Sequence, residues 1–359
     1  MLIFSLYNNL DNTYTICYHL GMFKPKYDIT EYFLSLIEKA GKLSAKIEET
    51  GVRLPVLAGL QKEALDRNVH ASTSIEGNVL NLAQVAALND KRGVTAAARQ
   101  KLEVENYTAA MRWILGNCKE AITIERIFKL HETIGRDLLS ADKTGVFKSK
   151  QNYVVDGNNL IVYAPPEPHD CPHMMDELLT WINSKEQVHP VIRSAIAHHQ
   201  FVSIHPFSDG NGRMARVLAQ WILYSNDFDP HHVIALDEFY AADRQRYYDK
   251  IQQTRELDYD FTFWIEYVAE GVVSTMETVY ARLSAFSTNS SEPVNLTPRQ
   301  EILIGLLRDH GQLDSNRLCE LMNINRARVN QLIGPLVKAG IVTQQGKTRG
   351  TRYYLKRNL

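Results

Sequence analysis

A run of twelve residues, His205–Arg216, constrains this chain more than any other segment. Its centre, Gly210-Asn211-Gly212, lacks the side chains that would keep backbone N–H groups away from an anion. A helical pattern of apolar residues follows, and the first N–H groups of a helix are unpaired and favour phosphate. The run therefore predicts a loop that opens a helix and binds a phosphorylated ligand.

The side chains of this run are those that a nucleotide-transfer site needs. Arg213 and Arg216 lie three positions apart, hence on one helix face, where both can hold phosphate oxygens. Asp209 offers a hard oxygen ligand for Mg²⁺ bound to phosphates. His205, close to its neutral form at pH 7, can take a proton from an attacking hydroxyl. A loop that merely caps a helix would need only part of this set.

The run matches the Fic family motif His-Pro-Phe-x-Asp/Glu-Gly-Asn-Gly-Arg-x-x-Arg at every specified position. Over about residues 50–285 the chain resembles Fic proteins, which implies a mainly α fold, a helical core with a β-hairpin flap. The resemblance implies transfer of AMP from ATP, with Mg²⁺, to a Tyr, Thr or Ser hydroxyl of a target protein, and also self-modification. It makes His205 the catalytic base and Asp209 the metal ligand. The nucleotide-binding residues that it implies in this run are Gly210, Asn211, Gly212, Arg213, Met214, Ala215 and Arg216.

Ser72 and Glu76 form a second candidate motif. They lie four positions apart, on one face if the segment is helical, and Gly77 can end that helix. The spacing alone is typical of an ordinary helix surface. The stretch Ser72–Gly77 also matches the Fic inhibitory motif Ser/Thr-x-x-x-Glu-Gly/Asn, N-terminal to the core as in one class of the family. The resemblance implies that Glu76 pairs with Arg216 and blocks the γ-phosphate position.

One segment differs from the helical pattern around it. Gln151–Val155 and Leu160–Tyr163 are short β-like runs around the turn Asp156–Asn159, which predicts a hairpin. In Fic proteins the matching hairpin is a flap that holds the target by main-chain hydrogen bonds. A surface hairpin without that role stays open. Family members often carry an arginine shortly before the flap, where this chain has Lys148 and Lys150, so the mode of target docking also stays open.

Aromatic and histidine side chains near the motif have two interpretations. An aromatic cluster after the core helix is typical of a hydrophobic core; its members are Phe239, Tyr240, Tyr247 and Tyr248. The resemblance implies that an aromatic pair borders the adenine, with Tyr247 the first candidate and Tyr248 the second. The side chains of His198 and His199 would point about 100° apart on a helix, so we expect structural roles for both. Phe207 is expected to anchor the loop in the core.

The C-terminal end is basic. Residues 296–359 carry 11 Lys and Arg against 4 Asp and Glu, a net charge of +7 in a chain whose total is −1. Three helical segments and a strand–turn–strand pattern resemble a winged helix-turn-helix, with Arg326 and Arg328 on the recognition helix and Lys347 and Arg349 at the wing. This end is predicted to contact DNA; a protein-docking or dimerisation module is the alternative.

The rest of the composition is that of an ordinary globular protein. Four widely spaced cysteines without a C-x-x-C pair, and the absence of a long apolar run, predict a cytoplasmic protein without membrane contact. Whether it forms a homodimer stays open. The expected divisions are an N-terminal extension and helix over residues 1–50, a Fic domain with the inhibitory helix over 51–286, a polar linker over 287–295 and the winged helix-turn-helix over 296–359.

Three alternatives to AMP transfer stay open. A Doc-type phosphotransferase shares the scaffold, but its motif has lysine where this chain has Gly212. Transfer of UMP or another phosphate-bearing group is compatible with a motif that holds phosphates and not the base. A protein that acts chiefly as a DNA-binding regulator belongs to another class, and the intact catalytic set argues against it.

Overall fold

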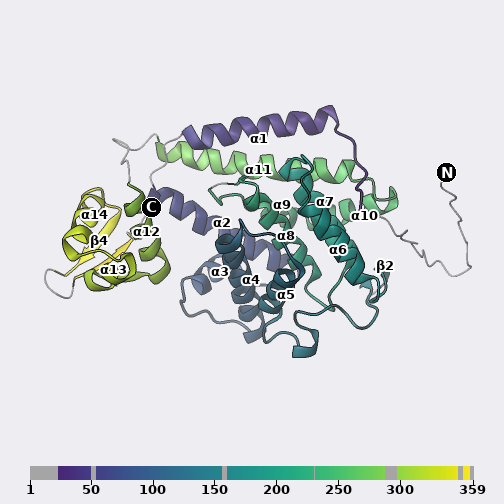
Figure 1. Ribbon diagram of the computed structural model, residues 1–359, viewed down its shortest axis with the longest axis horizontal. Coiled ribbons are helices and arrows are strands. Elements are labelled where there is room, and N and C mark those ends of the chain that lie inside the picture. The colour runs from purple at the N-terminus through teal and green to yellow at the C-terminus, as the bar shows by residue number, and fades with distance from the viewer. Residues whose placement is uncertain are drawn as a thin grey trace, which may run out of the picture. The chain divides into compact units, whose positions relative to one another are not determined.

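The computed structural model describes residues 23–49, 54–155, 160–229, 231–287, 297–346 and 351–355. These residues are mainly helical, which confirms the predicted fold class (Figure 1). They form two compact units: residues 23–36, 66–229 and 235–271 make the first, and the other described residues make the second. Three helices, α1 (Glu31–Glu49), α2 (Leu54–Ile75) and α11 (Thr262–Ser287), contribute to both units.

The first unit holds the motif. Its remaining helices are α3 (Leu82–Asn89), α4 (Ala98–Asn117), α5 (Ile124–Gly135), α6 (Cys171–Ile182), α7 (Pro190–Ile204), α8 (Asn211–Ser225), α9 (Leu236–Ala242) and α10 (Arg244–Glu256), with a 3-10 turn at Ala141–Lys143. Helices α7 and α8 pack against each other at its centre. The apolar stripe predicted along α8, from Met214 to Ile222, is buried, and Ser194 on α7 donates a hydrogen bond to the Ala219 carbonyl (2.9 Å). The burial of this helix pair fixes where the motif loop can lie.

Helix α9 lies close against α11 because Gly271 has no side chain. A Cβ at Gly271 would lie 2.5 Å from Phe239 and 2.8 Å from Leu236, both on α9. The close approach sets the position of Asp237, the second residue of α9, which is buried.

The predicted hairpin is present as β1 (Val154–Val155) and β2 (Ile161–Tyr163), which pair antiparallel. Its predicted turn, Asp156–Asn159, lies outside the described residues. Helix α5 ends at Gly135, because Arg136 is extended (φ −55°, ψ 124°) and Asp137 has φ 56°.

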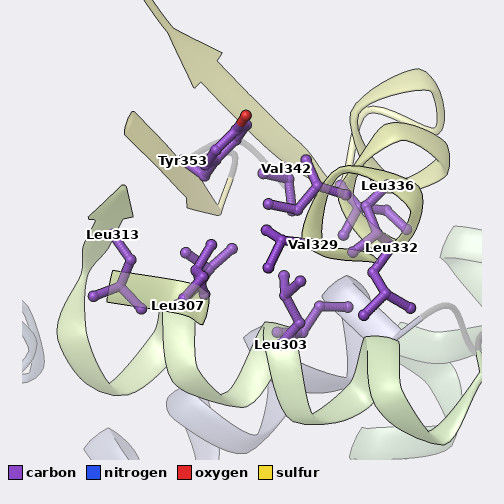
Figure 2. Close-up of a cluster of buried hydrophobic side chains, with 12 residues drawn as sticks. Leu303, Leu307, Leu313, Val329, Leu332, Leu336, Val342 and Tyr353 are labelled. Carbon is purple, nitrogen blue, oxygen red and sulfur yellow. The ribbon is translucent and has the colours of Figure 1, made fainter. Parts of the chain in front are cut away.

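The second unit includes a C-terminal module of α12 (Pro298–His310), β3 (Gln312–Asp314), α13 (Ser315–Met322), α14 (Arg326–Lys338), β4 (Val342–Gln345) and β5 (Arg352–Leu355). Its sheet has the order β3-β5-β4 and is antiparallel. Figure 2 shows its core, in which Leu303 and Leu307 of α12 face Val329 and Leu336 of α14, with Tyr353 of β5 beside them. The strand β3 was not predicted. The predicted wing tip, Lys347 and Arg349, lies outside the described residues, as does most of the expected linker.

Candidate active site

His205 ends α7 in the left-handed conformation (φ 50°, ψ 55°), which is unusual for a residue with a side chain and typical of strained functional positions. Its Nδ1 lies 3.2 Å from the Val202 carbonyl, so Nδ1–H donates that bond and Nε2 is left as the proton acceptor. Burial lowers the pKa of His205 to about 4, and the nearby charges of Lys148 and Arg255 act in the same direction. The imidazole is therefore neutral at pH 7 and can act as a base.

The motif loop, residues 205–210, is held from one side by His131 of α5. The His131 ring stacks on Phe207 at 3.7 Å, with the two ring planes 3° apart. Its Nδ1 accepts a hydrogen bond from the Gly145 N–H (2.9 Å), so Nε2–H donates to the Asp209 carbonyl (3.1 Å). Burial lowers the pKa of His131 to about 4, which keeps the ring neutral and this bonding pattern intact. Phe207, the expected anchor of the loop, is fully buried.

Two amide side chains hold the Phe207 peptide. The Asn211 side chain accepts a hydrogen bond from the Phe207 N–H (2.9 Å) and donates one to its carbonyl (2.8 Å). Asn152 donates a second hydrogen bond to the same carbonyl (3.0 Å), and its own oxygen accepts one from Lys148 (2.9 Å). The side chain of Asn211, which we expected to contact phosphate, is thus occupied with the loop.

The start of α8 has the features predicted for a phosphate site. Gly210 precedes the helix with φ 81°, in the left-handed region that suits glycine. The Asp209 side chain is 51% exposed, accepts a hydrogen bond from the Gly210 N–H (2.6 Å) and lies 3.6 Å from Arg213. The Nε of Arg213 is buried with no hydrogen-bond partner among the described residues.

The chemistry of Asp209 fits magnesium. Mg²⁺ commonly takes one or two protein carboxylates and fills its other positions with water and substrate phosphates. One accessible carboxylate beside a helix N-terminus meets that need. Within the described residues, no group of three or more His, Cys, Asp or Glu side chains is arranged to hold a metal by itself.

Arg216 lies one turn further along α8 and is enclosed by four residues. Together with them it forms what we call the arginine cluster: Ser72, Glu76, Tyr107, Arg216 and Asp237. The Arg216 side chain is 1% exposed and donates from Nε to Ser72 Oγ (2.7 Å) and from Nη2 to Glu76 Oε1 (2.7 Å). Nη2 also donates to the Ser72 carbonyl (3.0 Å). The structure thus brings together both residues of the predicted inhibitory motif and the second motif arginine.

Gly212 provides the space for the Glu76 carboxylate. A Cβ at Gly212 would lie 2.4 Å from Glu76 Oε1. The Glu76 carboxylate therefore occupies the space that a side chain at position 212 would fill.

Asp237 and Tyr107, on the other side of the cluster, were not predicted from the sequence. Asp237 Oδ2 lies 4.0 Å from Arg216 Nε and accepts a hydrogen bond from the Tyr107 hydroxyl (3.0 Å). Burial raises the pKa of Asp237, while Arg216 and hydrogen bonds from Tyr107 and Ser72 oppose the rise. Desolvation raises the pKa of Tyr107 well above its usual value, so its hydroxyl stays a donor. An acidic residue in the first turn of a helix is too common to single out Asp237.

Of the adenine candidates, Tyr247 is buried and Tyr248 is exposed. The Tyr247 hydroxyl lies 2.9 Å from His198 Nε2, and its ring stacks on Tyr240 at 4.9 Å. Tyr248 lies beside it, with its ring face under Arg244. Both His198 and His199 are completely buried, and His199 Nε2 lies 3.0 Å from the Ile251 carbonyl.

The hairpin is anchored next to His205 and carries exposed apolar side chains. The Tyr163 hydroxyl donates to the Ser203 carbonyl (2.8 Å), two residues before His205. Val155, Leu160 and Ile161 are exposed. An edge with such side chains suits a partner segment in extended conformation.

Similarity to known proteins concentrates on this region. Residues 121–223 match the model of the Fic/DOC family. A protein adenylyltransferase Fic from Aedes aegypti is 32% identical over 233 residues, 63% of this chain and 43% of the relative. One from Culex quinquefasciatus is 31% identical over 261 residues, 70% of this chain and 48% of the relative. The chain thus spans about half the length of the curated relatives that it matches.

A solved structure extends the likeness in fold. The crystal structure of a Fic family protein from Desulfovibrio desulfuricans has a TM-score of 0.64 with 24% sequence identity, and the match covers 94% of this chain and 99% of that one. None of the described helices is both long and apolar enough to cross a bilayer.

Proposed function

Because this chain belongs to the Fic/DOC family, as its motif predicts, we propose that it is a protein adenylyltransferase. It transfers AMP from ATP to a Tyr, Thr or Ser hydroxyl of a target protein, and to itself. The observation that carries the proposal is the position of His205, whose free Nε2 lies in the loop directly before the phosphate-binding start of α8. The chain has separate groups for deprotonating a hydroxyl and for holding a triphosphate.

In the proposed reaction the target hydroxyl oxygen attacks the α-phosphorus while His205 Nε2 takes its proton. The bond from the α-phosphorus to the β-phosphate oxygen breaks, and pyrophosphate leaves. Backbone N–H groups of Asn211 and Gly212, in the first turn of α8, hold the phosphates, and Arg213 neutralises their charge. Asp209 would hold Mg²⁺, which screens the phosphate charge when bound.

The arginine cluster supports autoinhibition. Arg216 is proposed to orient the γ-phosphate so that the α-phosphorus lies in line with the incoming hydroxyl. Glu76 now holds that guanidinium, 2.7 Å from Nη2. ATP that binds beside Glu76 would have its α-phosphate turned away from attack.

The hairpin β1–β2 is proposed to hold the target segment by strand addition, and its exposed apolar side chains support that role. Tyr247 and Tyr248 are proposed to border the adenine, with Tyr248 the more accessible of the two. The free thiols of Cys118, Cys171 and Cys319 support the proposal of a cytoplasmic protein.

Labelled nucleotides test this function. The parent protein and Glu76→Gly are incubated with ATP labelled at either the α- or the γ-phosphate, and the adduct is identified by mass spectrometry. We expect the α-label on protein, with more of it in Glu76→Gly. Glu120→Gly is the control, since Glu120 is an exposed carboxylate in the turn after α4. Label from the γ-phosphate alone would establish phosphoryl transfer instead, and a UTP arm tests base preference.

We propose in addition that the C-terminal module is a winged helix-turn-helix that binds DNA. Its element order and its β3-β5-β4 sheet support this topology. Arg326 and Arg328 are exposed in the first turn of α14, where a recognition helix meets the major groove. Salt-dependent binding of duplex DNA by the full chain tests this second function.

A further inference from the structure

Arg216 lies between two carboxylates that differ in freedom. The Glu76 side chain is 35% exposed and contacts the outer end of the guanidinium, at Nη2. The Asp237 side chain is 8% exposed and lies 4.0 Å from the inner nitrogen, Nε. One carboxylate can leave into solvent and the other cannot.

Asp237 is fixed by its neighbours. Tyr107 donates a hydrogen bond to the carboxylate oxygen that faces Arg216 (3.0 Å). The Asp237 N–H donates to the Asn68 side chain (3.2 Å), which lies four residues before Ser72 on α2. One side of α2 therefore contacts both Asp237 and Arg216. The contacts are made by Asn68, Ser72 and Glu76.

The Asp237 carboxylate changes the free energy needed to release Glu76 from Arg216. A buried guanidinium without a counter-ion is strongly unfavourable, because the interior solvates charge poorly. If Glu76 were the only anion beside Arg216, its departure would leave such a charge until a phosphate arrived. With Asp237 in place, the cluster passes from two carboxylates to one, and Arg216 keeps a partner throughout.

We propose that Asp237 is a positioning residue that acts as the permanent counter-ion of Arg216 and thereby allows Glu76 to be released. This role rests on the proposed autoinhibition by Glu76. It makes Glu76 the mobile partner, Asp237 the fixed one and Tyr107 the residue that holds the fixed one in place.

The test is a double-mutant cycle that needs no enzymatic activity. Thermal unfolding midpoints are measured for the parent, Glu76→Gln, Asp237→Asn and the double variant. Each single variant leaves Arg216 one carboxylate and the double variant leaves none, so the double variant should lose more than the sum of the single losses. Asp66→Asn replaces Asp237→Asn in a control cycle, since Asp66 is a buried carboxylate that accepts a hydrogen bond from Asn89 (2.7 Å). That control cycle should be additive, and an additive Asp237 cycle would overturn the proposal.

A rate measurement separates an effect on the release of Glu76 from an effect on the stability of the fold alone. Asp237→Asn should lower AMP transfer by roughly tenfold or more when Glu76 is present, because release becomes costlier. In the Glu76→Gly background, Asp237→Asn should lower the rate much less at saturating ATP, since no carboxylate has to leave Arg216. An equal loss in both backgrounds would overturn the proposal. Tyr107→Phe gives the same comparison in a milder form if Asp237→Asn does not fold.

ATP binding keeps this proposal distinct from the proposed function. In the double variant the phosphates replace the missing counter-ion, so ATP should raise the unfolding midpoint more than it does in Glu76→Gln. If ATP shifts none of the variants, the nucleotide site is wrong, while the unfolding cycle still decides whether Asp237 and Glu76 share Arg216. A larger ATP shift in Glu76→Gln than in the double variant would contradict the counter-ion role.

Discussion

The motif loop and the arginine cluster, joined through the first turns of α8, are held by different forces. The loop is fixed by neutral groups: the stacked ring of His131 and the amides of Asn152 and Asn211, whose hydrogen bonds end on loop backbone. The cluster is fixed by charges around Arg216, one of which is exposed. Neutral bonds to backbone do not compete with a triphosphate, whereas a carboxylate on an arginine does. The difference indicates a loop built in its working geometry and a cluster that must change.

The largest effect is expected from His205→Ala. Removing the base should lower AMP transfer by roughly 10²–10⁴-fold, because no other group takes the hydroxyl proton. ATP binding should stay largely intact, since the proposed mechanism uses His205 for the hydroxyl and not for the phosphates. Both are measured in the Glu76→Gly background, transfer by labelled AMP and binding by calorimetry. The exposed His169, changed to Ala, is the control. Transfer near the parent rate would remove His205 from the mechanism.

Glu76→Gly should have the next largest effect and tests the arginine cluster, which has to change before transfer. Truncating one partner of a partly buried, hydrogen-bonded charge pair costs about 2–5 kcal/mol, or roughly thirty-fold to several thousand-fold in the competent population. Initial rates of AMP incorporation are compared for the parent, Glu76→Gly and Glu76→Gly/Arg216→Ala. An unchanged rate in the single variant would make residues 72–77 an ordinary helix end. Activity that survives in the double variant would show that Glu76 restrains something other than Arg216.

His131 variants test the motif loop, which we expect to keep its geometry throughout the reaction. His131→Phe keeps a ring against Phe207 but loses both hydrogen bonds, so the loop should loosen and kcat fall by about tenfold. His131→Gln offers an N–H in place of Nε2–H and should lose less. Rates and ATP affinity are measured in the Glu76→Gly background. If Phe and Gln behave alike, the bond from His131 to the Asp209 carbonyl does not matter.

The pH dependence should reflect the neutral character of the loop. The base form of His205 is required, and its pKa is lowered to about 4, so activity is lost only as pH falls through that value. We expect kcat/KM for ATP of Glu76→Gly to stay level from pH 7 to about 5. A fall in kcat/KM near pH 6.5 would mean that His205 has the pKa of a solvated histidine. Circular dichroism at each pH provides the control, because buried His131 and His199, with pKa values lowered to about 4 and about 3, disfavour the folded state as pH falls below 6.5.

Features formed by residues close together in the sequence were predicted, and contacts between residues far apart in the sequence were not. The motif loop, the α8 stripe and the pair Ser72 and Glu76 are readable because each lies within a few turns of chain. The bond between Tyr107 and Asp237 joins residues 130 positions apart, and no local pattern announces it. Helix α2 was not predicted over its full length because it buries polar residues, including Asp66 and Asn68, which break the apolar period. His131 could have been found, since it lies on the apolar stripe of α5 with Ile127 and Ile134.

The smallest effect is expected in the C-terminal module, where Arg326 and Arg328 are exposed, in contrast to the enclosed Arg216. The full chain should bind duplex DNA weakly and with strong salt dependence, since each phosphate contact releases about one counterion. Changing both arginines to Ala should reduce the slope of log affinity against log salt by about 2 and leave AMP transfer unaffected. Arg317→Ala, on α13 beside Glu320, is the control. Gel-shift titrations at several salt concentrations measure the slope. If the parent chain shows no binding at low salt, the module has another partner, and protein docking or dimerisation becomes the stronger interpretation of its basic surface.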